Sequence, residues 1–281
     1  MVRLSVVIPT FGRPRELERA LAALPDGLEV IVVADARDQN PPDGALKAAR
    51  PGASAARNLG WQAATGEVIL FLGDDVVAEP GLIHAHASAH TEHAAVEEAV
   101  LGYVEWSREL KVTPFMRFLE TGFQFDYGKV DPSEADWWAL YTANVSLKRE
   151  LLERAGGFDE EGFPFLYEDV ELGYRLSKLG LRLFYVPEAR AEHLHAPTLA
   201  EFRTRMRTVG AAERRLVEKH PEIPPYFKAM FDAVLAEPRP AGLSGRLVGL
   251  APGHPRVKAS AEARWRYALA KAFMAGWESG R

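Results

Sequence analysis

Three short apolar runs near the amino terminus restrict what this 281-residue chain can fold into. They span residues 4–8, 30–33 and 68–72, and none of them alternates apolar with polar side chains. Such strands are apolar on both faces, as the central strands of a parallel sheet covered by helices must be. Apolar residues at helical spacing follow the first run, and an alanine-rich stretch precedes the third. This order predicts an α/β fold with a doubly wound, mostly parallel sheet flanked by helices.

The composition excludes several classes of protein. Lys and Arg number 34 against 39 Asp and Glu, a net charge of −5, whereas nucleic-acid binding needs a basic surface. The chain has no Cys, which excludes a disulfide scaffold, a thiolate metal site and a cysteine nucleophile. No apolar run approaches the roughly 20 residues that span a bilayer, and residues 1–9 lack a signal-peptide core. We therefore expect a cytoplasmic protein that binds no nucleic acid.

The rest of the chain is less regular as far as residue 190 and helical beyond residue 197. Thr198 and Glu201 have the spacing of a capping box, so a helix should begin there. A last helix is predicted over residues 260–277. The elements expected in the middle are strands over 100–106, 139–147 and 181–186, and helices over 114–121, 149–155 and 167–179.

Polar residues follow the apolar runs, and in an open parallel sheet ligands bind outside the carboxyl ends of the strands. Asp74 and Asp75 follow the third run, and adjacent carboxylates repel one another unless a cation lies beside them. Such oxygens suit Mg²⁺ or Mn²⁺, which binds through one or two carboxylates plus substrate phosphates and stabilises a diphosphate leaving group. The alternative is that the pair only caps a helix that begins near Pro80. The other residues at these strand ends are Pro9, Thr10, Phe11 and Asp35.

Between about residues 4 and 195, six motifs occur in an order and at spacings that together form a specific signal. They are residues 6–11 (VVIPTF), 32–35 (VVAD), 54–58 (SAARN), 66–75 (GEVILFLGDD), 156–160 (GGFDE) and 167–176 (YEDVELGYRL). On these motifs the chain resembles a family 2 glycosyltransferase, which has the GT-A fold. The resemblance implies an inverting enzyme that moves a sugar from a nucleotide diphosphate to an acceptor hydroxyl group with a divalent metal ion.

The resemblance also implies residue roles. Asp35 would accept hydrogen bonds from the base or the sugar, and Arg57 would reach toward the base or the phosphates. Asp75 would bind Mg²⁺ or Mn²⁺, and His193 would contact the metal or the diphosphate. The donor, a UDP-, GDP- or dTDP-linked sugar, would be held by Pro9, Thr10, Phe11, Arg13, Asp35, Arg57 and Asp74.

A general base is expected at Asp169. Displacement with inversion needs a hydroxyl group that loses its proton on the face opposite the leaving nucleotide. A carboxylate in the first turn of a helix is held rigidly, and Asp169 at the start of the helix predicted over 167–179 meets that description. Glu168 beside it is the second candidate and would bind acceptor hydroxyl groups. The alternative is that Asp169 only stabilises the helix.

Two residues depart from the family's pattern. Ala34 replaces the first of two Asp residues that usually follow the second strand, which affects base recognition. Gly73 replaces the first Asp of the metal motif and leaves one carboxylate fewer for the metal. Residues 45–52, where relatives often have another short strand, are weakly apolar and are expected to form a loop.

The resemblance divides the chain into a GT-A domain over residues 1–196 and a helical extension over residues 197–281. Residues 1–100 would bind the nucleotide-sugar, and residues 101–196 would supply the base and the site for a carbohydrate or lipid-linked acceptor. Trp265, Leu269, Phe273 and Trp277 form an apolar stripe at helical spacing. We expect this stripe to pack on the catalytic domain or on a second subunit, with peripheral contact at the inner face of the membrane as the alternative.

Other candidate residues have two interpretations. His86, His90 and His93 share a helical face, a spacing that can chelate zinc, but a solvated surface is the preferred interpretation. Trp137 and Trp138 would either stack on an acceptor sugar or pack in the core.

Two other functions are open. Ala34 and Gly73 motivate a nucleotide-sugar-binding protein without transfer activity. A sugar nucleotidyltransferase has a similar sheet, but its glycine-rich basic loop after the first strand is poorly matched by residues 10–14 (TFGRP).

Overall fold

The computed structural model describes residues 2–131, 133–240 and 254–279. The chain forms two compact units. The first contains the chain up to residue 110 together with residues 125–195, and the second contains residues 111–124 and the chain from residue 196 onward. The functional division at residue 196 stays a prediction.

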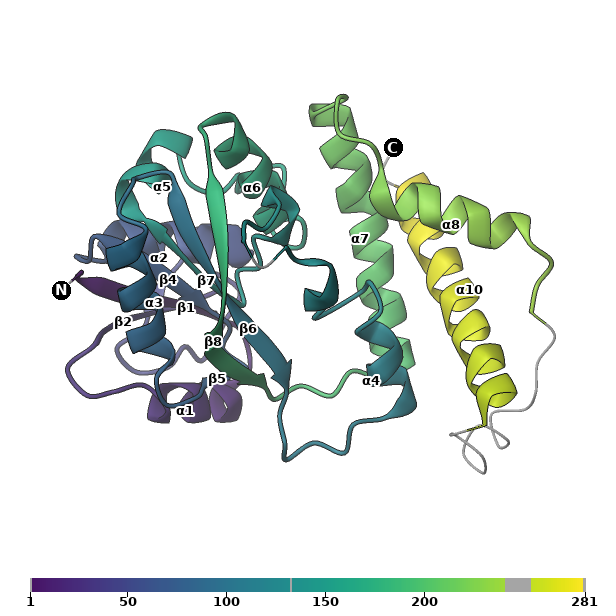
Figure 1. Cartoon of the computed structure of the whole chain (residues 1–281), viewed down its shortest axis with the longest axis horizontal. Helices are drawn as coiled ribbons and strands as arrows, with labels where there is room; N and C mark the ends of the chain where they lie inside the picture. Colours follow the sequence, from purple (N-terminus) through teal and green to yellow (C-terminus); the bar gives the residue numbers. More distant parts are fainter. Residues whose placement is uncertain (1, 132, 241–253, 280–281) are drawn as a thin grey trace. The chain divides into compact units, whose positions relative to one another are not determined.

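An eight-stranded sheet forms the core of the first unit (Figure 1). Its strands are β1 (Leu4–Thr10), β2 (Glu29–Ala34), β3 (Leu46–Lys47), β4 (Val68–Leu72), β5 (Val76–Ala78), β6 (Glu98–Trp106), β7 (Asn144–Lys148) and β8 (Arg182–His193). The order across the sheet is β3-β2-β1-β4-β7-β6-β8-β5. Strands β1 to β4 run parallel, as do β6 and β8, whereas β5 and β7 run antiparallel to their neighbours. The predicted α/β sheet is confirmed.

Helices cover the sheet because its central strands are apolar on both faces. Every residue of β4 is buried, as the uninterrupted apolar run predicts. Small residues let α2 approach β1 closely: a Cβ on Gly60 would lie 2.3 Å from Val7 Cγ1. Helix α2 packs on β1 and β2, and α3 packs on β6 and β8. The helices of this unit include α1 (Pro14–Ala22), α2 (Ala53–Ala63), α3 (Leu82–Glu92), α5 (Arg149–Ala155) and α6 (Glu168–Lys178).

Three departures from the predicted elements concern the strands. Strand β8 continues past residue 186 because its pairing with β6 jumps from Gly102–Val186 to Tyr103–Arg190, and the bulge accommodates Pro187. Strand β7 begins five residues later than predicted, since residues 137–139 form a 3₁₀ turn. The expected loop over 45–52 contains the two-residue strand β3.

A buried network of polar side chains connects α3 to β7. His86 lies 2.8 Å from the Ser146 hydroxyl through Nδ1 and 2.9 Å from Asn144 Oδ1 through Nε2. His90 Nε2 lies 2.8 Å from the same hydroxyl, and Lys148 Nζ lies 2.7 Å from His90 Nδ1. Burial lowers the pKa of His86 to about 4 and that of His90 to about 3. The prediction that His86 and His90 lie on a solvated surface is therefore wrong, because polar side chains of β7 contact both rings.

The described helices of the second unit are α4 (Pro114–Leu119), α7 (Leu199–Lys219), α8 (Tyr226–Ala236) and α10 (Pro255–Ser279). The capping box predicted at Thr198 is present: Glu201 N donates to Thr198 Oγ1 at 3.2 Å, and Thr198 N donates to Glu201 Oε2 at 2.8 Å. None of the helices in the described ranges has the length and apolar character needed to cross a membrane.

The apolar stripe of α10 packs inside the second unit. Leu269 and Phe273 are fully buried, and the Trp265 ring lies 5.4 Å from the Phe115 ring of α4. Helix α7 approaches this helix so closely that a Cβ on Gly276 would lie 1.8 Å from Arg207 O. The stripe thus contributes to the core of its own unit.

Candidate functional site

The candidate site lies at the carboxyl ends of β1 and β4, where the strand order reverses. The loop after β4 carries Asp74 and Asp75, and each residue is 7% exposed. Strand β5 follows directly, and α3 begins at Leu82 behind Gly81. The two carboxylates therefore do not cap that helix, which removes the alternative drawn from the sequence.

Asp74 is held from β1. The Thr10 hydroxyl donates to Asp74 Oδ2 at 2.9 Å, and Phe11 N lies 3.4 Å from the same oxygen. Burial, and then the charge of Asp75, raises the pKa of Asp74. Pro9 lies one residue earlier, paired with Val33 in the sheet. Backbone and side-chain donors at the end of β1 thus orient a carboxylate at the edge of the sheet.

Arg13 and His193 complete this group, which we call the acidic rim (Arg13, Asp74, Asp75 and His193). Arg13 NH1 lies 3.1 Å from Asp74 Oδ1 and 2.5 Å from Asp75 Oδ2. His193, at the end of β8, places Nε2 3.5 Å from Asp75 Oδ2. Burial lowers the pKa of His193, although the nearby Asp75 carboxylate opposes this shift. The structure thus brings the two predicted metal ligands together.

The rim fits a divalent ion that binds together with a diphosphate. Within residues 2–131, 133–240 and 254–279, no group of three or more His, Asp or Glu side chains is arranged to hold a metal ion. Asp75 supplies one carboxylate oxygen and His193 one neutral nitrogen, and Mg²⁺ is usually bound through one or two carboxylates plus substrate phosphates and water. The donor set is therefore sufficient for Mg²⁺ or Mn²⁺ with a phosphate ligand.

Asp35 lies just beyond β2 and is bound by a residue that the sequence analysis missed. Arg37 donates to Asp35 Oδ1 through Nε and to Oδ2 through NH2, both at 2.8 Å, and Gly52 N donates to Oδ2 at 2.7 Å. Burial alone would raise the pKa of Asp35, but these hydrogen bonds lower it to about 2. Arg37 N also donates to Asp35 Oδ1 at 2.8 Å, so Asp35 binds the backbone two residues later and forms a turn. An Asp followed two residues later by Arg was therefore the signal in the sequence that could have identified Arg37.

Phe11 joins Asp35 to the acidic rim. Its ring is 48% exposed, and the Arg37 guanidinium lies 4.6 Å from the ring centre. An exposed ring with a guanidinium beside it is a surface on which a planar base can stack. The donor residues predicted after β1 and β2 thus form one continuous group.

Arg57 and Glu168 form a second group. Arg57, on α2, donates through NH1 to Glu168 Oε1 at 2.8 Å, and the Phe158 ring lies 5.6 Å from its guanidinium carbon. Arg57 Nε and Glu168 Oε2 have no hydrogen-bond partner among the described residues. Arg57 and Glu168, which were predicted separately as site residues, therefore form an ion pair with each other.

Asp169 is the second residue of α6 and is partly exposed. Leu166 and Tyr167 before it adopt left-handed backbone conformations, with φ of 63° and 67°. Non-glycine residues in this region cost about 1–2 kcal/mol each and persist where the surroundings impose them. The helix start that carries the predicted base is therefore held in a strained arrangement.

The start of α2 forms hydrogen bonds with the loop that precedes α6. Ser54 N donates to Pro164 O at 3.2 Å, and the Ser54 hydroxyl donates to Phe163 O. Gly52 lies so close that a Cβ would be 2.3 Å from Pro164 O. The residues that bind Asp35 and the residues that precede Asp169 are thus in direct contact.

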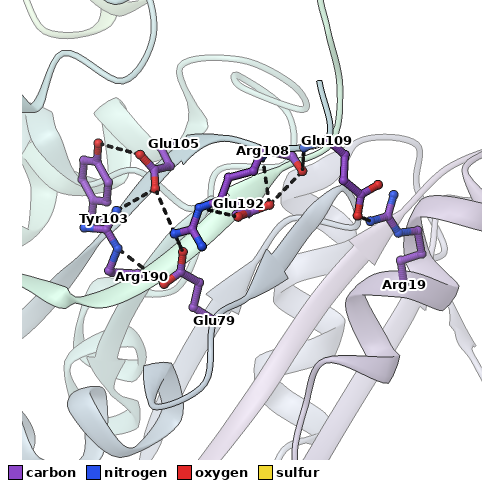
Figure 2. A network of polar contacts seen from close by, with 9 residues as sticks. Arg19, Glu79, Tyr103, Glu105, Arg108, Glu109, Arg190 and Glu192 are labelled. Carbon is purple, nitrogen blue, oxygen red and sulfur yellow. Dashed lines mark hydrogen bonds and ion pairs between the residues drawn. The ribbon is translucent and has the colours of Figure 1, made fainter. Parts of the chain in front are cut away.

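A polar network lies on the ends of β6 and β8 (Figure 2), and its residue Glu192 directly precedes His193. Arg190 NH2 donates to Glu105 Oε1 at 2.6 Å, and Arg108 NH2 donates to Glu79 Oε1 at 2.7 Å. Arg108 Nε also lies 3.3 Å from Glu192 Oε1. Successive residues of a strand point to opposite faces, so Glu192 anchors β8 from the face opposite His193. This network could not be identified from the sequence.

Comparisons with known proteins identify the family of this chain. A family model described as glycosyltransferase like family 2 matches residues 3–211. Validoxylamine A glucosyltransferase from Streptomyces hygroscopicus subsp. limoneus is 26% identical over 79% of this chain and 58% of its own length. The chain therefore spans less than two thirds of that relative. The family match confirms the resemblance drawn from the sequence motifs.

Solved structures show the same fold. Mannosyltransferase PcManGT from Pyrobaculum calidifontis, in complex with GDP-Man and Mn²⁺, has a TM-score of 0.60 at 18% identity and covers 99% of this chain and 88% of its own. Glucosyl-3-phosphoglycerate synthase from Mycobacterium tuberculosis, in complex with Mn²⁺, UDP-Glc and phosphoglyceric acid, has a TM-score of 0.51 at 20% identity. That alignment covers 75% of this chain and 78% of the synthase.

Proposed function

The chain belongs to glycosyltransferase family 2, and from this premise we propose that it transfers a sugar from a nucleoside diphosphate to an acceptor hydroxyl group with inversion. The observation that carries the proposal is the acidic rim at the point where the strand order reverses. Ligands of open α/β sheets bind in that position. Asp75 and His193 would hold Mg²⁺ or Mn²⁺, which when bound supplies positive charge to the departing diphosphate.

The donor would extend from the rim to Asp35. Phe11 offers an exposed ring for the base, and Asp35 with Arg37 offers acceptors and donors for its edge or for the ribose. Asp74, fixed by Thr10, would bind the ribose or the donor sugar. The two structural relatives bind GDP-Man and UDP-Glc, so we propose a guanosine or uridine diphosphate sugar as donor.

Asp169 would act as the general base. The acceptor oxygen forms a bond to the anomeric carbon while the bond from that carbon to the diphosphate oxygen breaks. The hydroxyl proton passes to the Asp169 carboxylate, and the nucleoside diphosphate leaves with the electron pair. Positioned proton transfer of this kind contributes about 10²- to 10⁴-fold to the rate. A carbohydrate or a lipid-linked molecule is the proposed acceptor, and the second would bring the chain to the inner face of a membrane.

The test is a transfer assay with UDP-, GDP- and dTDP-linked sugars, Mn²⁺ and a pool of acceptors. Release of nucleoside diphosphate that depends on the acceptor, with a product of inverted anomeric configuration by NMR, is the expected result. Tight donor binding without hydrolysis or transfer to any acceptor would favour a nucleotide-sugar-binding protein. Pyrophosphate release from a nucleoside triphosphate would favour a nucleotidyltransferase.

A further inference from the structure

Arg13 connects the two carboxylates of the acidic rim. A single nitrogen, NH1, lies 3.1 Å from Asp74 Oδ1 and 2.5 Å from Asp75 Oδ2. The Arg13 side chain is 43% exposed, whereas the two carboxylates are about 9% and 10% exposed. A half-exposed cation thus neutralises two buried anions.

The oxygen that Arg13 binds is the one that a metal ion would need. Asp75 Oδ2 accepts the hydrogen bond from Arg13 and lies 3.5 Å from His193 Nε2. An ion bound to Asp75 and His193 would therefore lie a few ångströms from the guanidinium. Like charges this close repel one another at the effective dielectric constant of a protein surface, and a divalent ion is repelled about twice as strongly as a monovalent one. Arg13 and a divalent ion consequently compete for Asp75.

The Arg13 side chain has room to turn toward solvent, because it is 43% exposed. Pro14, the first residue of α1, restricts the backbone of the residue before it, and Gly12 makes the turn with φ of 67°. The guanidinium is planar and always charged, and its fork of donors matches phosphate oxygens. A diphosphate beside the rim would therefore offer Arg13 a second set of partners.

We propose that Arg13 makes metal binding at the acidic rim depend on diphosphate binding. When no diphosphate is bound, the guanidinium holds Asp75 and weakens the affinity for a divalent ion. When a nucleoside diphosphate binds, Arg13 transfers to its phosphate oxygens, and Asp75 Oδ2 becomes available to the ion. Gly73 stands where the family's motif has a further Asp. The Arg13 guanidinium therefore has two carboxylates to neutralise and not three. The inference rests on the proposed function in that a nucleoside diphosphate binds at this rim.

The experiment measures Mn²⁺ binding by electron paramagnetic resonance of the free ion, first without nucleotide and then with saturating GDP or UDP. The variants are Arg13→Gln, which removes the charge, and Arg13→Lys, which keeps it. Arg3→Gln is the matched control, because Arg3 is exposed before the opposite end of β1, about 20 Å from Thr10, and the net charge changes equally. Circular dichroism and thermal unfolding check that each variant folds.

We expect Arg13→Gln to bind Mn²⁺ alone at least about tenfold more tightly than the wild type, a difference of about 1.4 kcal/mol. Nucleotide should strengthen Mn²⁺ binding by about tenfold or more in the wild type and clearly less in Arg13→Gln. Arg13→Lys should resemble the wild type without nucleotide.

Equal Mn²⁺ affinity of the wild type and Arg13→Gln without nucleotide would overturn the inference, as would an equal gain in Arg3→Gln. If Arg13→Gln fails to fold, Mn²⁺ binding by the wild type that is unaffected by nucleotide would overturn it as well. Absence of any nucleotide binding by the wild type is a failure of the proposed function. That outcome removes the coupling to diphosphate, while the measurements with Mn²⁺ alone still decide whether Arg13 competes with the ion.

Discussion

Arg57 NH1 donates to Glu168 Oε1 at 2.8 Å, and both side chains are more than nine-tenths buried. Arg57 lies on α2, whose start binds Asp35, and Glu168 directly precedes Asp169. The ion pair therefore joins the helix on the donor side to the helix that carries the proposed base. Because Arg57 Nε and Glu168 Oε2 have no further hydrogen bond among the described residues, each charge depends on the other.

We predict that Arg57→Met lowers the free energy of unfolding by about 3–5 kcal/mol, because it leaves Glu168 as an unpaired buried charge. Glu168→Met should have a similar effect for the same reason. The double variant should lose much less than the sum, since it removes both charges and keeps apolar volume. Urea unfolding of the four proteins gives the coupling energy. Single losses that simply add in the double variant would contradict this prediction.

Asp169→Asn should strongly slow transfer while leaving donor binding intact. The amide cannot take up the acceptor proton, so we expect turnover to fall by about 10²- to 10⁴-fold. Calorimetric titration with the nucleoside diphosphate and Mn²⁺ should give an unchanged dissociation constant. Glu153→Gln, at an exposed position of α5, removes one negative charge as the control. Near-normal turnover of Asp169→Asn would remove the base assignment.

The sequence predicts the parts of the fold and site that depend on local pattern. Strand β4 and the carboxylates after it follow from one apolar run and its end. Arg37 was missed although it lies two residues from Asp35, because the turn can be recognised only once Asp35 is known to be bound. The partner of Arg57 could not be predicted, since Glu168 is 111 residues away and only the tertiary fold brings the two side chains together.

Burial of the histidines of α3 also depends on distant residues. His86 and His90 have the spacing of a surface face, and only the polar side chains of β7, about 60 residues later, make their burial favourable. The length of β8 was underestimated because a proline normally ends a strand. Here a bulge removes Pro187 from the hydrogen-bonding ladder, and the strand continues.

The contact between Gly52 and Pro164 provides a test of the strained loop before Asp169. A Cβ on Gly52 would meet Pro164 O at 2.3 Å, and φ at Gly52 is 114°. Gly44 also has a positive φ, of 75°, but no atom lies within 4 Å of its added Cβ. Gly44→Ala bears a backbone cost of about 1–2 kcal/mol. Gly52, with φ of 114° and ψ of 156°, lies in a region essentially restricted to glycine, so its backbone cost is at least as large.

We expect Gly52→Ala to lose about 1–3 kcal/mol more than Gly44→Ala, because it alone forces backbone atoms apart and its backbone conformation is the less accessible to alanine. Since the loop carries Asp169, turnover should fall more than donor affinity in Gly52→Ala and should stay near the wild-type value in Gly44→Ala. Chemical denaturation and steady-state kinetics measure the two effects. Equal stability of the two variants would show that the loop yields without cost.

The buried histidines should make the protein sensitive to mild acid. The pKa of His86 is about 4 and that of His90 about 3 in the folded chain, against 6.5 for an ordinary histidine. Between these values the unfolded chain binds more protons than the folded chain, so stability is complete above pH 6.5 and is lost as the pH falls below it. At pH 5.5 each ring should cost about 1.4 kcal/mol relative to pH 8, or about 3 kcal/mol for the two together.

Urea unfolding at pH 8 and at pH 5.5 measures this loss, and NMR titration should show both rings still neutral at pH 5.5. His84→Gln is the control, because His84 is exposed on the same helix. His86→Gln should be less stable than the wild type at pH 8, yet should lose about 1.4 kcal/mol less on acidification, since one buried group no longer gains a proton on unfolding. A pH dependence that is the same in the wild type and in this variant, or a His86 resonance that titrates near pH 6.5, would show that the ring is not confined as a neutral group by Ser146 and Asn144.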